Sequence, residues 1–170
     1  LEPAVPAPET RVRTVLAAAV LKGDKMDHVI RDAVMLGVDA IQPLVTSRTE
    51  IALGALAKGR RVERWQRVAV ASVKQCGRAV VPPVMEPRTF AHYLSAGGAG
   101  TRIMCVEPSA PTAGVVAVRD VPTPVFAHIV VGPEGGWAPA EVEAAAGAQW
   151  VLVSLGARTL RADTVPLVAL

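Results

Sequence analysis

Five short, mainly apolar runs alternate along this chain with segments of helical periodicity. The runs cover residues 11–21, 40–46, 102–107, 126–131 and 150–155. A strand that reads as a continuous apolar run is buried on both faces, which is typical of parallel sheets. A strand with one solvent-exposed face instead alternates apolar and polar residues. The sequence therefore predicts an α/β fold in which helices cover both faces of a parallel sheet.

The segments between these runs carry the signals of helices. In the first of them Asp24 is suited to begin a helix and Gly37 to end it, with apolar residues at helical spacing in between. Further helices are predicted over residues 60–77, 89–96, 139–147 and 162–170, and an irregular connection over residues 112–124. In such folds ligands bind in the loops that follow the carboxyl ends of the strands, so a site is expected there.

Composition limits the classes of protein that remain. The chain has 170 residues, of which 51% are hydrophobic, which fits one domain with a full core. No apolar run reaches the ~18 residues of a membrane helix, and two cysteines are too few for a disulfide framework, so a cytoplasmic location is expected. The net charge of +3 permits a polyanionic partner without requiring one. Prolines within residues 1–10 predict an extended linker, followed by one domain over residues 11–170.

A glycine-rich loop, Gly132-Pro-Glu-Gly-Gly136, joins the apolar run 126–131 to the helix that opens near Pro139. Glycines let the backbone adopt positive φ and approach a ligand closely, and free N–H groups near a helix start suit an anion. An ordinary tight turn between strand and helix explains the same residues about equally well. The spacing matches neither a P-loop nor a dinucleotide fingerprint, so nucleotide-dependent oxidoreductases are disfavoured.

A second glycine loop follows the run 150–155 and carries charged residues. Arg158 and Arg161 lie in the loop itself, and Asp163 and Thr164 stand where the next helix begins. The last two are ordinary capping residues. Two arginines beside a strand end could hold a phosphate or stabilise an anion that develops on a substrate, although a solvated loop is the plainer interpretation.

Four segments in this order resemble the signature of the RsmE family. They are LKGDKMDHVIRDAVMLGVDAIQPLVTSRTE (21–50), RWQRVAVASVKQCGRAVVPPV (64–84), VGPEGG (131–136) and LGARTLRADT (155–164). Members of this family are SPOUT-class methyltransferases that modify N3 of uridine 1498 in 16S ribosomal RNA. The resemblance runs from about residue 12 to the end. It departs from the family pattern at Asp163, Val165 and Pro166, and the family's last helix extends beyond Leu170.

The resemblance implies a SPOUT-type fold with a C-terminal trefoil knot, a homodimer and an S-adenosylmethionine pocket between knot loops. It also implies that the linker 1–10 follows a PUA-like β-barrel domain that is not part of this sequence. The residues that it assigns to the cofactor are Val106, Glu107, Val131, Gly132, Glu134, Gly135, Gly136, Leu155, Gly156, Thr159, Leu160 and Thr164.

The implied reaction gives roles to charged residues. Uridine N3 is a weak acid, and a cation near it favours the anion that attacks the methyl group. Arg161 is the first candidate for this cation and Arg48 the second, while Asp163 could accept the proton or orient Arg161. Contacts to 16S ribosomal RNA, within the small ribosomal subunit, are expected from Arg60, Arg61, Arg64, Arg78 and Arg158, although such a run is equally explained as a solvated face. No metal and no membrane are expected.

Two further functions remain open at this point. One is a SPOUT enzyme that acts on another RNA position. The other is a non-catalytic RNA-binding or ribosome-assembly module, an alternative that the departures at Asp163 and Val165 leave open. Binding of S-adenosylmethionine without methylation would favour the module.

Overall fold

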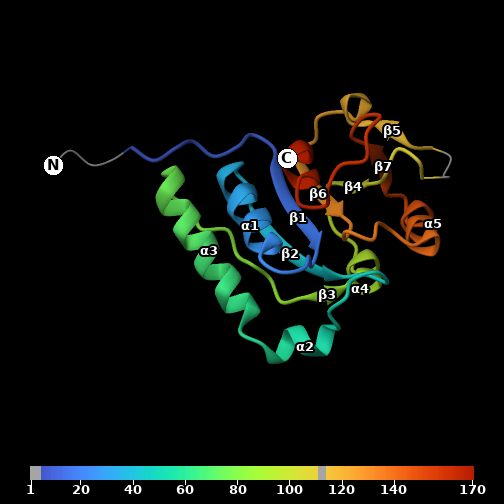
Figure 1. Ribbon diagram of the computed structural model, residues 1–170. Coiled ribbons are helices and arrows are strands. Elements are labelled where there is room, and N and C mark those ends of the chain that lie inside the picture. Colours follow the sequence, from blue (N-terminus) through green and yellow to red (C-terminus); the bar gives the residue numbers. More distant parts are fainter. Residues whose placement is uncertain (1–4, 111–113) are drawn as a thin grey trace.

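The computed structural model describes residues 5–110 and 114–170, and within these residues it forms one sheet of seven parallel strands (Figure 1). The strands lie in the order β3-β2-β1-β6-β4-β7-β5. Their bounds are Arg13–Ala19 (β1), Ala40–Val45 (β2), Arg88–Thr89 (β3), Thr101–Cys105 (β4), Val116–Ala117 (β5), Phe126–Val131 (β6) and Val151–Ser154 (β7). Each of the five predicted runs overlaps a strand, and the predicted parallel α/β architecture is confirmed.

Helices cover both faces of this sheet, as predicted. Their bounds are Lys25–Met35 (α1), Leu53–Lys58 (α2), Arg61–Cys76 (α3), Phe90–Ser95 (α4), Pro139–Gly147 (α5) and Val165–Ala169 (α6), with a 3-10 turn at Val118–Asp120 (η1). One hydrophobic cluster joins the sheet to α1 and α3 and includes Leu16, Ile30 and Trp65. A second joins the other face to α4 and α5 and includes Ala17, Phe90 and Val142. Successive residues of β1 thus enter opposite clusters, which explains why the strand is apolar throughout.

The structure differs from the prediction where local signals were weak or were misread. The short elements α2 and β3 were not predicted, and β5 and η1 lie in a connection that was expected to be irregular. Part of that connection, residues 111–113, lies outside the described residues. The last helix was predicted to begin at Ala162 but begins at Val165. Proline is accepted only in the first helical turn because it lacks an N–H donor, so Pro166 forces the later start.

The segment before β1 is fastened to the domain by Arg78. Within the described part of the predicted linker, the Ala7 N–H donates to the Gly77 carbonyl oxygen at 2.9 Å. The side chain of Arg78 is only 5% exposed and pairs with Glu9. Its Nη1 also donates to the carbonyl oxygens of Val34 (2.9 Å) and Val38 (3.1 Å). This geometry disfavours the prediction that Arg78 contacts RNA, because the guanidinium is enclosed and bonds to Glu9, Val34 and Val38.

Replacing Arg78 by alanine is expected to destabilise the fold. The variant leaves two carbonyl oxygens and the Glu9 carboxylate without their charged donor. Removing one member of such an enclosed pair costs about 2–4 kcal/mol of unfolding free energy, less than a fully buried pair because Glu9 remains partly exposed. Urea denaturation followed by circular dichroism measures this loss. Arg13→Ala, which removes a largely exposed partner of Asp39, is the control and should cost much less.

Candidate active site

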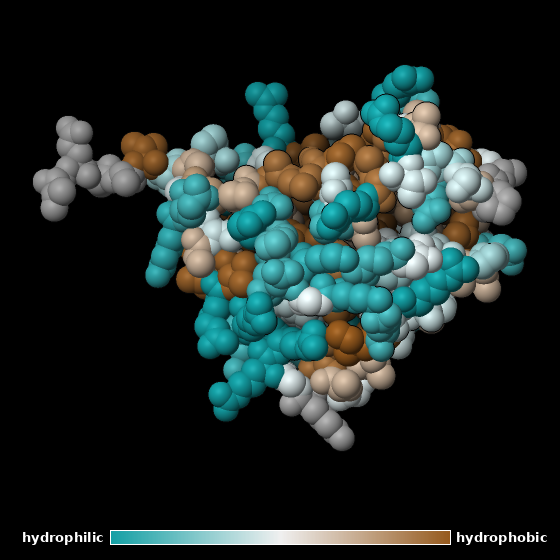
Figure 2. Space-filling model, viewed as in Figure 1, coloured by the Kyte–Doolittle hydropathy of each residue, from teal (hydrophilic) through white to brown (hydrophobic). Residues whose placement is uncertain are grey.

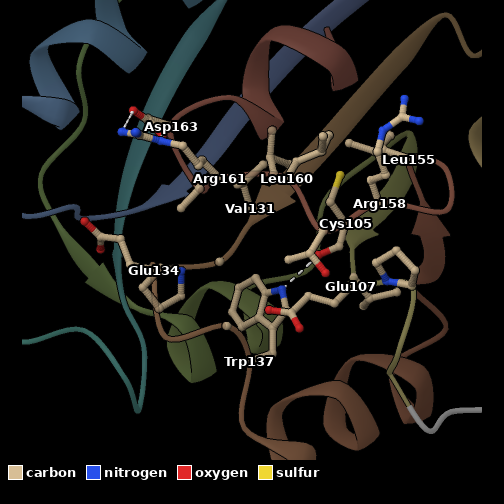
Figure 3. Close-up of a pocket in the computed structure, with 18 of the residues that line it drawn as sticks. Cys105, Glu107, Val131, Glu134, Trp137, Leu155, Arg158, Leu160, Arg161 and Asp163 are labelled. Atoms are coloured by element: carbon tan, nitrogen blue, oxygen red, sulfur yellow. Dashed lines mark hydrogen bonds and ion pairs between the residues drawn. The ribbon is translucent and has the colours of Figure 1, made fainter.

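A pocket of about 210 Å³ opens at the carboxyl edge of the sheet, where three loops meet (Figure 3). The loops follow the neighbouring strands β6, β4 and β7. Ligand sites of parallel sheets lie at this edge because the strand ends leave backbone groups and loop side chains facing one crevice. The location expected from the sequence is therefore the one at which the pocket occurs.

Most residues that were assigned to a cofactor line this pocket. They are Val106, Glu107, Val131, Gly132, Glu134, Gly136, Leu155, Thr159 and Leu160. Gly135, Gly156 and Thr164 are not among the lining residues. Arg161 and Asp163 line the pocket together with Arg158, whereas Arg48 reaches it indirectly, through a hydrogen bond from its Nη1 to the Gly135 carbonyl oxygen (2.8 Å). Lys25 and Trp137 also line the pocket. From the sequence, Lys25 has no assigned role, whereas Trp137, just after the glycine-rich loop, is expected either to cover a cofactor or to shield the helix start.

One wall is built from Gly132 and Trp137. The Trp137 indole Nε1 donates to the Cys105 carbonyl oxygen at 2.9 Å, and the ring packs against Phe90 with centroids 4.9 Å apart. A Cβ atom at Gly132 would come within 2.9 Å of the indole Cε2. This position must be glycine because the backbone of the loop after β6 lies directly against a ring that is fixed from two other sides.

The end of the same loop is a tight turn that also faces the pocket. The Gly136 N–H donates to the Pro133 carbonyl oxygen at 2.9 Å, and Gly136 has a φ of 68°. A Cβ atom at Gly136 would lie 2.7 Å from Oε1 of Glu107, which stands across the pocket on the loop after β4. The two interpretations of the glycine-rich loop, a turn and a ligand-facing loop, thus describe the same residues.

Glu134 connects this loop to the turn between β1 and α1. Its Oε1 accepts hydrogen bonds from Lys25 Nζ at 2.9 Å and from the Lys22 backbone N–H at 3.2 Å. Burial by itself raises the pKa of Glu134, but the hydrogen bonds from Lys25 and from backbone N–H groups outweigh burial and hold that pKa below its usual range. Glu134 is therefore ionised at neutral pH and places a negative charge at the pocket.

Arg161 and Asp163 form a two-pronged ion pair on the loop after β7 (Figure 3). Arg161 Nε lies 3.0 Å from Oδ1 of Asp163, and Nη2 lies 2.8 Å from Oδ2. The hydrogen bonds from Arg161 hold the pKa of Asp163 below its usual range. A carboxylate with a lowered pKa is a poor general base. The suggestion that Asp163 accepts the substrate proton is therefore disfavoured, and its geometry suits the alternative suggestion that it orients Arg161.

Other reactive side chains do not take part in the pocket's chemistry. Burial raises the pKa of the Cys105 thiol to about 12, so the thiol is neutral and unreactive at physiological pH. His128 lies outside the lining residues, is half-buried, and has its Nδ1 2.6 Å from the Tyr93 hydroxyl. Within residues 5–110 and 114–170, no group of three metal-ligating side chains gathers, and no helix there is long and apolar enough to cross a membrane.

The basic residues at the start of α3 lie on a different part of the surface. Arg60 and Arg61 are exposed. Arg64 is paired with Asp27 of α1 through its Nε, at 2.9 Å from Oδ2. Figure 2 shows mainly hydrophilic side chains over α3 in this view. These arginines form a separate surface and add nothing to the pocket.

Known proteins match this chain over nearly its whole length. A family model described as "RNA methyltransferase domain" matches residues 8–170. The chain is 35% identical to ribosomal RNA small subunit methyltransferase E of Synechocystis over 165 residues, 95% of this chain and 53% of that protein. It is 31% identical to the Bacillus subtilis protein of the same name over 167 residues, 95% of this chain and 65% of that protein. The chain thus spans about half to two thirds of the length of these relatives.

Solved structures show the same arrangement of elements. A ribosomal RNA small subunit methyltransferase E from Neisseria gonorrhoeae, bound to S-adenosyl methionine, superposes with a TM-score of 0.82 at 33% identity and covers 95% of this chain and 65% of its own. A protein from Legionella pneumophila, solved in complex with the cofactor SAM, gives a TM-score of 0.84 at 28% identity, with the same coverage of 95% and 65%. Since the family model spans nearly the whole sequence, this chain belongs to the RNA methyltransferase domain family.

Proposed function

We propose that this chain catalyses the S-adenosylmethionine-dependent methylation of uridine N3 in 16S ribosomal RNA, at the position equivalent to uridine 1498. The observation that carries the proposal is the pocket at which the loops after β4, β6 and β7 meet, in a chain whose relative from Neisseria gonorrhoeae binds S-adenosyl methionine. The family match over residues 8–170 supports an RNA substrate.

The residues of the pocket fit this cofactor. At Gly132 and Gly136 the backbone lies so close to Trp137 and Glu107 that no side chain fits, so glycine keeps the loop against the pocket walls. Leu155 and Leu160 offer apolar surface suited to the flat adenine ring of S-adenosylmethionine, and the backbone groups beside them can form hydrogen bonds with the edge of that ring. When bound, S-adenosylmethionine supplies a methyl group on a positively charged sulfur. The charge of Glu134 is balanced by its ion pair with Lys25, and this pair holds the glycine-rich loop against the start of α1.

The chain's own charged side chains account for activation of the uracil ring. Arg161 places a permanent positive charge at the pocket rim, where it favours the anionic form of the uracil ring. Asp163 holds the guanidinium in place through two hydrogen bonds. Arg48 braces the glycine-rich loop through the Gly135 carbonyl oxygen, which makes it a positioning residue in this scheme.

The partners follow from the same proposal. Arg60, Arg61 and Arg158 are exposed and are suited to contact RNA phosphates, with Arg64 beside them. Leu167 and Val168 of α6 are 44% and 49% exposed, and Figure 2 shows hydrophobic surface near the C-terminal end of the chain. An apolar face of this kind suits the homodimer, and we propose that α6 closes the trefoil knot beside it. Acting on ribosomal RNA, the protein would work in the cytoplasm.

Calorimetric titration tests the cofactor, with S-adenosylmethionine as the ligand and NAD as the control. We expect saturable binding of S-adenosylmethionine and none of NAD, because the glycine loop lacks the dinucleotide fingerprint. Methylation is then measured by mass spectrometry of 16S ribosomal RNA from small subunits that lack the modification. Binding of the cofactor without appearance of 3-methyluridine would favour the non-catalytic module, and a methyl group elsewhere in the RNA would favour another SPOUT specificity. Binding of NAD would contradict the assignment of the pocket.

A further inference from the structure

Lys25, the first residue of α1, lines the pocket although it belongs to neither of its glycine loops. Its side chain is 33% exposed, and Nζ donates to Glu134 Oε1 at 2.9 Å. An ammonium group carries three donors and a single contact with Glu134 uses one of them. Lys25 therefore has donors left for a ligand in the pocket.

Lys25, Arg158 and Arg161 are the cations among the lining residues, and two of them are each paired with a carboxylate. Arg161 pairs with Asp163, and Lys25 pairs with Glu134. The positive charge of Lys25 also helps to keep the pKa of Asp163 low, so the two pairs lie within electrostatic reach of each other. Lys22 and Glu50 form a separate ion pair, and neither lines the pocket. Two cations near one another suit a substrate that develops negative charge on two atoms.

Uracil deprotonated at N3 is such a substrate. Its negative charge is shared by the two carbonyl oxygens that flank N3, so one cation can neutralise only one side. We propose that Lys25 is a second catalytic cation, whose Nζ stabilises the charge on one carbonyl oxygen while Arg161 stabilises the charge on the other. This inference rests on the proposed function and adds a residue to it.

The step balances without another reactant. N3 loses its proton to solvent water, and its electron pair forms the bond to the methyl carbon. The bond between that carbon and sulfur breaks, and its electron pair remains on sulfur as S-adenosylhomocysteine leaves. Lys25 and Arg161 keep their protons throughout and act only through charge and hydrogen bonds. The products are 3-methyluridine and S-adenosylhomocysteine.

The test compares Lys25→Met with Lys22→Met. Both variants remove a lysine from the same turn, but the Lys22 side chain pairs with Glu50 and does not line the pocket. At pH 7 we expect Lys25→Met to lower turnover on small ribosomal subunits by about 10- to 100-fold, less than the loss of a sole charge-stabilising donor because Arg161 remains. The dissociation constant of S-adenosylmethionine, measured by calorimetry, should change less than about threefold. Lys22→Met should match the wild type in both measurements, and Lys25→Arg should recover most of the turnover.

The pH profile separates a catalytic cation from a structural lysine. Without Lys25 the pKa of uracil N3 in the complex rises, and each tenfold loss of turnover at low pH corresponds to a rise of one pKa unit. The turnover deficit of Lys25→Met should therefore shrink as the pH approaches the raised N3 pKa. A deficit of constant size from pH 6.5 to 9.5 would overturn the proposal. So would a loss of cofactor affinity as large as the loss of turnover. If the wild type itself forms no 3-methyluridine, the proposed function fails rather than the role of Lys25 within it.

Discussion

Replacement of Gly132 by valine is expected to weaken S-adenosylmethionine binding by about 100-fold. A Cβ atom at this position would lie 2.9 Å from the Trp137 ring, which cannot withdraw without losing its hydrogen bond to Cys105 and its packing on Phe90. Either the indole moves into the pocket or the loop after β6 moves away from the ligand. Forced shifts of this kind cost about 1–3 kcal/mol, and the upper end corresponds to a factor of about 100 in affinity.

The same variant should remain folded with a lowered melting temperature. For a chain of this length, 1 kcal/mol corresponds to about 2–4 °C, so a decrease of several degrees is expected. Gly147→Val is the matched control, because a Cβ atom at Gly147 at the end of α5 meets nothing within 4 Å. Calorimetry gives the affinity and differential scanning fluorimetry the melting temperature. An unchanged affinity in a folded Gly132→Val protein would show that the cofactor binds elsewhere.

The structure identifies Gly132 as the glycine whose replacement most affects the pocket, and the loop sequence alone does not distinguish it from Gly135. Gly135 lies within the loop, but it is not among the lining residues, and its carbonyl oxygen accepts a hydrogen bond from Arg48. The sequence indicates that a glycine-rich loop follows a strand. Which glycine meets a side chain depends on where Trp137 lies, and that is set by contacts with other strands.

The fold was largely predictable because its signals are local. The strands β1, β2, β4, β6 and β7 each read as an apolar run. Asp24 and Pro139 mark the starts of α1 and α5, and Gly77 marks the end of α3. The order β3-β2-β1-β6-β4-β7-β5 could not be read in this way, since it depends on pairings between segments far apart in the sequence.

The roles of charged residues also depend on contacts between distant segments, which local sequence patterns do not reveal. Arg78 and Arg64 both look like members of a basic helix face, yet Arg78 is enclosed by the domain and Arg64 is paired with Asp27. Conversely, Lys25 looks like an ordinary helix-start residue but lines the pocket beside Glu134, a residue more than a hundred positions away. Whether a charge is structural or functional is decided by its partner, and these partners come from distant segments.

Replacement of Arg161 by alanine should have the largest effect on turnover, a loss of about 100- to 1,000-fold, which is typical for removing a donor that stabilises developing negative charge. The side chain is 73% exposed, so little stability depends on it. Binding of S-adenosylmethionine should change by less than about fivefold, because the guanidinium is assigned to the uracil ring. Equal losses of turnover and cofactor affinity would instead assign Arg161 to the cofactor.

The variant Asp163→Asn distinguishes a carboxylate that orients Arg161 from one that acts as the general base. If Asp163 only orients the guanidinium, the amide should retain part of that contact and turnover should fall by about 5- to 20-fold, well short of Arg161→Ala. If Asp163 were the general base, its loss would equal or exceed that of Arg161→Ala, and the hydrogen bonds that lower its pKa would have to be broken in the complex. Arg31→Ala is the control, since Arg31 forms the same two-pronged pair with Asp32 on α1, away from the pocket. Single-turnover rates for the three variants therefore decide whether the carboxylate takes the proton or holds the cation that makes the proton easier to lose.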